Sequence, residues 1–115
     1  MLEFLCLAAI AIDGDTLRCA NIEQADGRVR IARIDAPERR QPGYAKAQAA
    51  LAGMIAGRYV RCVQVDADPR EGGVQRLDRY GRIVARCEAG GRQLGPAMIA
   101  LHHAEAWPKK PRKRG

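Results

Sequence analysis

Aromatic residues are scarce in this sequence, with one Trp, one Phe and three Tyr among 115 residues. Aliphatic side chains and alanine must therefore fill the interior. Hydrophobic residues make up 47% of the chain, enough for one core in one domain, and this excludes a wholly disordered chain. No apolar run is long enough to span a membrane. The run at residues 4–12 lacks the basic flank and cleavage site of a signal peptide, so it predicts a strand.

Acidic residues are too few to balance the basic ones, because 13 Asp and Glu face 20 Lys and Arg and leave a net charge of +7. This excess favours an anionic partner such as nucleic acid or an anionic membrane face. Five of the positive charges lie in KKPRKR at residues 109–114. Such a segment is typical of a solvated end, and weak contact with phosphates is the alternative. We expect one domain over residues 1–108 and a basic tail over residues 109–115.

No Cys-x-x-Cys spacing occurs among the four cysteines, which argues against a zinc site. Cys62 and Cys87 lie on two predicted strands that should pair, so we predict a disulfide between them in an oxidising compartment. Cys6 and Cys19 flank a predicted turn at residues 13–14 and form a less certain pair, because they fall out of register without a bulge. Four buried free thiols are the alternative.

The hydrophobic pattern predicts an α+β fold. Strands are expected over residues 3–12, 16–20, 28–34, 59–65 and 81–87, and helices over residues 44–56 and 94–103. Three strands, a helix, two strands and a short C-terminal helix match the five-stranded Greek-key barrel of the oligonucleotide-binding (OB) fold, whose helix lies between strands three and four.

Three acidic residues, Asp15, Asp35 and Glu38, stand where turns and strand ends could bring them together, and Arg30 and Arg82 lie on strands beside them. Carboxylates supply the oxygen ligands of a hard cation, and arginine binds phosphate oxygens in a bidentate geometry. The set therefore suits phosphodiester cleavage. Judged by spacing alone, each of these residues could have an ordinary structural role instead, as a turn residue, a helix cap or a surface arginine.

Three motifs in order carry a more specific signal: IDGDTL at residues 12–17, RIARIDAPE at 30–38 and DRYGR at 78–82. Together they resemble the signatures of the thermonuclease (staphylococcal nuclease-like) family over roughly residues 4–107. The resemblance implies a Ca²⁺-dependent nuclease that hydrolyses phosphodiester bonds of single-stranded or unpaired DNA and RNA with little base specificity. A non-catalytic oligonucleotide-binding module and a structural domain are the alternatives.

The resemblance also implies individual roles. Asp15, Asp35 and the main-chain carbonyl of Ala36 would bind Ca²⁺, and Glu38 would lie near a metal-bound water. The scissile phosphate would contact Arg30 and Arg82, and Tyr80 would help shape the nucleotide pocket.

The sequence departs from the family near its C-terminal end. His102 and His103 replace a usual glycine stop, and no third helix follows; we expect surface or capping roles for both histidines. Trp107 is expected to pack on the core, with base stacking as the alternative. A disulfide would favour a secreted or periplasmic protein whose signal has been removed, and the cytoplasm is the alternative.

Overall fold

Two sheets and two α-helices make up the part of the chain that this computed structural model describes, residues 3–71 and 77–109. The larger sheet has the strand order β1-β6-β7-β4-β3-β2, with β8 paired to β7. Its strands are β1 (Glu3–Cys6), β2 (Ile10–Asp13), β3 (Thr16–Arg18), β4 (Arg28–Ile31), β6 (Val60–Gln64), β7 (Ile83–Ala89) and β8 (Arg92–Gln93). The smaller sheet pairs β5 (Ile34–Asp35) with β9 (Glu105–Ala106).

The larger sheet is mixed, because β4 and β7 run parallel while its other pairs are antiparallel. Its two end strands, β1 and β2, are consecutive in the chain and are separated by a bend at residues 7–9, where Ala8 has a φ of 50°. The predicted single strand over residues 3–12 is therefore wrong in detail. The segment bends instead, and its two halves form the first and last strands in the order of the larger sheet.

The α+β class and the helix between the third and fourth predicted strands are confirmed. Helix α1 (Tyr44–Ile55) follows the predicted period, with Ala47, Leu51 and Ile55 buried. Helix α2 (Leu94–Ala100) is shorter than predicted, and a 3₁₀ turn, η1 (Gln24–Gly27), precedes β4. Among the described residues the larger sheet has seven strands rather than five, because the first predicted strand is divided and β8 was not foreseen.

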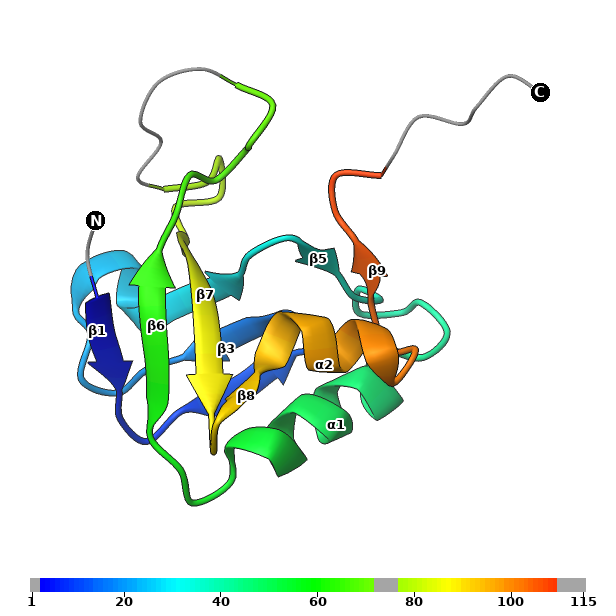
Figure 1. The fold of residues 1–115 in the computed structure, drawn as a ribbon, viewed down its shortest axis with the longest axis horizontal. Helices are drawn as coiled ribbons and strands as arrows, with labels where there is room; N and C mark the ends of the chain where they lie inside the picture. The colour runs from blue at the N-terminus through cyan, green and yellow to red at the C-terminus, as the bar shows by residue number, and fades with distance from the viewer. Residues whose placement is uncertain (1–2, 72–76, 110–115) are drawn as a thin grey trace.

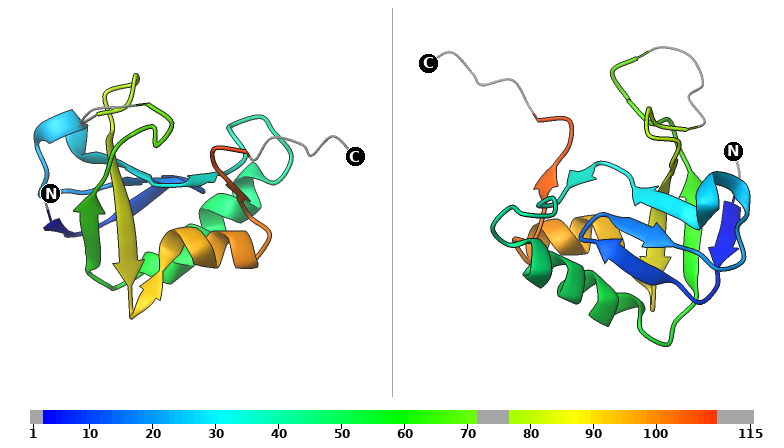
Figure 2. Two further views of the ribbon diagram at one scale, coloured as in Figure 1. Left: turned by 45° about the horizontal axis from the view of Figure 1, so that its top comes forward. Right: turned by 180° about the vertical axis from the view of Figure 1, so that it is seen from behind.

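The core is aliphatic and sulfur-rich, as the shortage of aromatic residues requires. Its largest fully buried side chains include Leu17, Ile31, Ile34, Leu51, Leu94 and Met98. Helices α1 and α2 lie side by side next to β2 and β7 (Figures 1 and 2). The described segments that follow β6 and precede β7, residues 65–71 and 77–82, lie at the other end of the β6–β7 hairpin from the connection that follows α1 (Figure 1).

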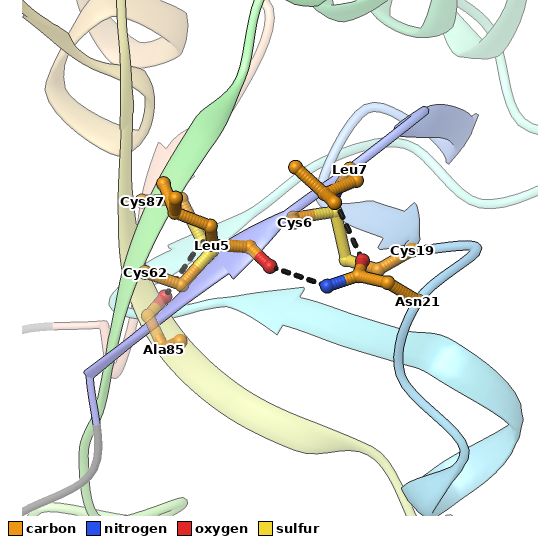
Figure 3. The surroundings of a disulfide bond; sticks show 8 residues. All are labelled: Leu5, Cys6, Leu7, Cys19, Asn21, Cys62, Ala85 and Cys87. Atoms are coloured by element: carbon orange, nitrogen blue, oxygen red, sulfur yellow. Dashed lines mark hydrogen bonds between the residues drawn. A yellow bond between two sulfur atoms is a disulfide. The ribbon is translucent and has the colours of Figure 1, made fainter.

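The disulfide joins Cys6 to Cys19, with their Cα atoms 5.0 Å apart (Figure 3). The expected hairpin bulge is present as a register shift between Ala11 and Asp13. The bend after Cys6 also removes this residue from the hairpin, because β1 pairs with β6 rather than with β3. Asn21 adds two hydrogen bonds beside the bridge, to the main chain of the residues on either side of Cys6.

The predicted bridge between Cys62 and Cys87 is wrong in this structure, where both are free buried thiols. They lie directly opposite each other on β6 and β7, as expected, and their sulfur atoms are 2.7 Å apart (Figure 3). The hydrogen bond with Cys62, together with burial, raises the pKa of the Cys87 thiol well above its ordinary value.

Candidate functional site

Asp15 lies in the tight turn between β2 and β3 and is 7% exposed. Its Oδ1 accepts a hydrogen bond from Thr16 Oγ1 at 3.0 Å, and its Oδ2 accepts one from the Ala36 N–H at 2.9 Å. The main-chain oxygen of Asp15 accepts a further bond from the Ile31 N–H at 2.7 Å. The β2–β3 turn is thereby tied both to β4 and to the loop that follows β5.

Gly14 allows this turn to pack tightly between α1 and that loop. A Cβ atom at Gly14 would lie 2.7 Å from the Ala47 Cβ and 2.8 Å from the Ala36 Cβ, closer than side-chain atoms approach. Helix α1 also satisfies the free edge of β2, because Tyr44 Oη donates to the Ile12 carbonyl and Gln48 Nε2 donates to the Ala11 carbonyl. Helix packing therefore fixes the position of Asp15.

Arg30 extends from β4 between two carboxylates. Its Nη1 is 3.4 Å from Asp15 Oδ2, and its Nη2 is 3.9 Å from Asp35 Oδ1. Nη1 also donates to the Ile31 carbonyl at 3.0 Å. The Arg30 side chain is 16% exposed and the Asp35 side chain 46% exposed, so this cluster borders solvent on the Asp35 side.

Arg82 is oriented by its own turn. The Asp78 carboxylate accepts bonds from the main-chain N–H groups of Tyr80 and Arg82, both at 2.9 Å, and from Arg82 Nε at 2.7 Å. Gly81 takes a φ of 77°, a left-handed conformation that suits glycine. Arg82 Nη1 lies 3.4 Å from Thr16 Oγ1, which connects the turn to the Asp15 side of the site.

Asp13 is a neighbouring carboxylate to which the sequence reasoning assigned no chemistry. Its Oδ1 accepts a hydrogen bond from the Asp15 N–H at 3.1 Å. Burial, followed by the hydrogen bond and the charge of Asp15, raises the pKa of Asp13 to about 6. The only sequence signal was its place in the Asp-Gly-Asp turn, which resembles an ordinary hairpin turn.

One pocket of about 1040 Å³ collects these groups. The predicted site residues that line it are Asp15, Arg30, Asp35, Ala36, Glu38, Tyr80 and Arg82. Glu38 is exposed at the rim, and its own N–H donates to Gln41 Oε1 at 2.7 Å. The structure therefore brings the predicted residues of all three motifs to one place.

The same pocket contains groups that the sequence reasoning did not assign to it. Arg33 and Trp107 line it, and the Trp107 N–H donates to the Arg33 carbonyl at 3.0 Å. The Arg70 guanidinium lies 5.1 Å from the centre of the Trp107 ring. Trp107 is therefore a pocket residue rather than a fully buried core residue, whereas His102 and His103 do not line the pocket.

Residues 3–71 and 77–109 contain no cluster of three or more His, Cys, Asp or Glu side chains able to hold a metal ion. The predicted ligands are of a different kind, two carboxylates and the main-chain carbonyl of Ala36. All are hard oxygen donors, which suits Ca²⁺. Asp15 and Asp35 both lie within 4 Å of the Arg30 guanidinium, Asp15 at Nη1 and Asp35 at Nη2. The donor set therefore fits a hard cation.

The family model of staphylococcal nuclease homologues matches residues 28–113. The chain belongs to the staphylococcal nuclease homologue family. The match contains Arg30, Asp35, Glu38 and Arg82, and the structure adds Asp15 from outside the matched range. Membership confirms the predicted family and implies an OB-fold with a nuclease or nucleic-acid-binding function.

The chain is also 34% identical over 103 residues to Protein ParB of Escherichia coli. The aligned part covers 84% of this chain and 52% of that protein, so the chain spans about half the length of this relative. Within the described residues, no helix is both long and apolar enough to cross a membrane. The basic tail predicted over residues 109–115 lies, beyond Lys109, outside the described residues.

Proposed function

We propose that this protein is a Ca²⁺-dependent nuclease that hydrolyses phosphodiester bonds of DNA and RNA with little base specificity. The observation that supports this most is the position of Arg30 between Asp15 and Asp35, in the pocket that Arg82 also lines. Phosphoryl transfer needs positive groups around a phosphate and carboxylates for a cation, and one pocket holds both.

Asp15, Asp35 and the carbonyl of Ala36 would hold the ion. When bound, Ca²⁺ supplies positive charge that polarises a phosphoryl oxygen. The bonds that Asp15 accepts from Thr16 and Ala36 fix its carboxylate beforehand. This preorganisation reduces the conformational freedom that is lost when the ion binds.

The two arginines would bind the non-bridging oxygens of the scissile phosphate and stabilise the charge that develops on them. Arg82 suits this role because Asp78 accepts from its Nε and Thr16 from its Nη1, while its Nη2 has no hydrogen bond to the described residues. Glu38, exposed at the pocket rim, would orient and deprotonate the attacking water. The water oxygen then bonds to phosphorus as the bond to the leaving sugar oxygen breaks, and that oxygen takes a proton from solvent.

The experiment is incubation with labelled single-stranded DNA or RNA in the presence of Ca²⁺, with and without a chelator. Cleavage that the chelator abolishes supports the nuclease. Binding without cleavage would instead support a non-catalytic oligonucleotide-binding module, the second function that family membership allows. No interaction with either nucleic acid would contradict both.

We also propose that the protein acts in an oxidising compartment, as a secreted or periplasmic protein. The bridge between Cys6 and Cys19 supports this, because such bonds are rare in reducing compartments. Alkylation of the non-reduced protein followed by mass spectrometry should label only Cys62 and Cys87. Four labelled thiols would contradict the proposal and favour the cytoplasm.

A further inference from the structure

Two arginines outside the proposed catalytic set lie opposite each other on adjacent strands. Arg18 on β3 and Arg28 on β4 are direct partners in the antiparallel register. Like charges at directly opposite positions repel each other and weaken a strand pair. A repulsive pair beside a phosphate-binding pocket therefore suggests that an anion normally lies between them.

This pair shares a sheet face with the proposed site. Arg30 stands two residues after Arg28 on β4, and residues two apart on a strand point to the same side. The register also pairs Thr16 with Arg30, so β3 and β4 present Thr16, Arg18, Arg28 and Arg30 on one face. Arg28 itself lines the pocket. Arg28 therefore continues the positive surface from Arg30 towards Arg18, at a spacing of about 6.8 Å along the strand.

Internal carboxylates do not neutralise these two charges. Arg30 and Arg82 each face aspartates, whereas Arg18 and Arg28 form no ion pair with any described residue. Among the described residues, Arg28 donates only to main-chain oxygens, from Nε to Ala25 and from Nη2 to Tyr80, both at 3.3 Å. Arg18 is exposed. The two guanidinium charges remain available to an external anion.

We propose that Arg18 and Arg28 form a second phosphate site, which binds the phosphodiester next to the scissile one on the same nucleic-acid strand. The inference rests on the proposed function, because it places the scissile phosphate at Arg30 and Arg82. It gives the protein a preference for substrates with at least two phosphodiester bonds. Base identity plays no part, since guanidinium contacts to phosphate carry no sequence information.

The test compares two substrates in Ca²⁺, a thymidine dinucleotide with a single phosphodiester and a thymidine strand of about ten nucleotides, within the usual span of an OB-fold site. Arg18→Gln should raise KM for the longer strand by about two- to fivefold, the range for a partly exposed charge contact. The KM for the dinucleotide should not change. The salt dependence of binding to the longer strand should fall by about 0.7 in log–log slope, the value for one lost phosphate contact on a single strand.

Arg92→Gln is the matched control, because Arg92 is an exposed arginine on β8, at the other end of β7 from the 78–82 turn. It removes the same charge and should change neither the KM nor the slope beyond a small general effect. Arg28→Lys should keep the slope, while Arg28→Gln should lower it, because the charge rather than the fork makes this contact.

Identical behaviour of Arg18→Gln and Arg92→Gln would overturn the second phosphate site while leaving the proposed nuclease standing. An equal rise of KM on both substrates would also overturn it, because Arg18 would then act at the scissile phosphate. Binding without cleavage in the unmodified protein would contradict the nuclease, and the salt slopes would still decide the second site. If the unmodified protein neither binds nor cleaves nucleic acid, both the proposed nuclease and the second phosphate site are contradicted.

Discussion

Arg30 and Arg82, the two arginines proposed to bind the scissile phosphate, are held in different ways. Arg82 and its partner Asp78 are four residues apart in one turn, and their Nε and Oδ2 atoms lie 2.7 Å apart. Arg30 lies 3.4 Å and 3.9 Å from Asp15 and Asp35, and each of these three residues belongs to a different strand or turn. One half of the site is local in sequence, and the other half is assembled by the tertiary fold.

This difference predicts which changes harm which half. The Arg82 half depends on the bonds inside the 78–82 turn. The Arg30 half depends on the packing of Gly14 between Ala36 and Ala47, because that contact positions Asp15. Substitutions in the 78–82 turn should therefore alter phosphate binding. Substitutions beneath the β2–β3 turn should alter the affinity for Ca²⁺.

The largest effect is expected from removing the guanidinium fork. Arg30→Lys and Arg82→Lys should each lower kcat about 10²- to 10³-fold, comparable with the loss of one preorganised charge donor. Arg82→Lys also loses the bond to Asp78 and should be at least as harmful as Arg30→Lys. Steady-state kinetics on single-stranded DNA measures both. Full activity in either variant would contradict the bidentate role.

Asp78→Asn should lower kcat about 10- to 100-fold, because Arg82 loses its charged anchor and is displaced from the phosphate. Ca²⁺ affinity should stay the same, since Asp78 belongs to the local half of the site. Asp26→Asn, at an exposed position in η1, is the control and should change neither quantity. A drop in Ca²⁺ affinity for Asp78→Asn would mean that the two halves are not separable.

Gly14→Ala should reduce the free energy of unfolding by about 1–3 kcal/mol, the usual cost of an overpacked site. It should also weaken Ca²⁺ binding, because the added methyl group displaces the turn that carries Asp15. Gly53→Ala is the control, since nothing lies within 4 Å of a Cβ at this helical position. Alanine there should stabilise the protein slightly through helix propensity. Denaturant unfolding and calorimetry test the pair, and equal stability of the two variants would contradict the packing argument.

The smallest effect is expected at the end of α2. His102 has a φ of 60°, a left-handed conformation that favours glycine at the end of a helix. His102→Gly should raise the free energy of unfolding by up to about 1 kcal/mol by relieving this strain. His103→Gly, at a residue without positive φ, should give no gain. Thermal unfolding distinguishes them, and catalysis should not change in either variant.

The sequence predicted best those features that are local in sequence. The 44–56 helix followed from its apolar period, and Arg82 and Tyr80 followed from a five-residue motif. Asp78 lay in the same motif, yet its role needed the turn geometry. The Cys6–Cys19 bridge was ranked below Cys62–Cys87 because the pair falls out of hairpin register without a bulge. The bend at residues 7–9, which removes Cys6 from that hairpin, has no strong turn signal in the sequence. Trp107, Arg33 and Arg70 meet in the pocket only through tertiary packing, so no spacing rule could group them.

Calorimetric titration of Ca²⁺ into the unmodified protein and into Asp15→Asn shows whether Asp15 belongs to a cation site. Asparagine keeps an acceptor for the Ala36 N–H, so the turn should survive while one anionic ligand is lost. We expect Ca²⁺ binding by the unmodified protein and clearly weaker binding by the variant, with unfolding still cooperative. Equal affinity in the two proteins, or no Ca²⁺ binding by either, would contradict this assignment.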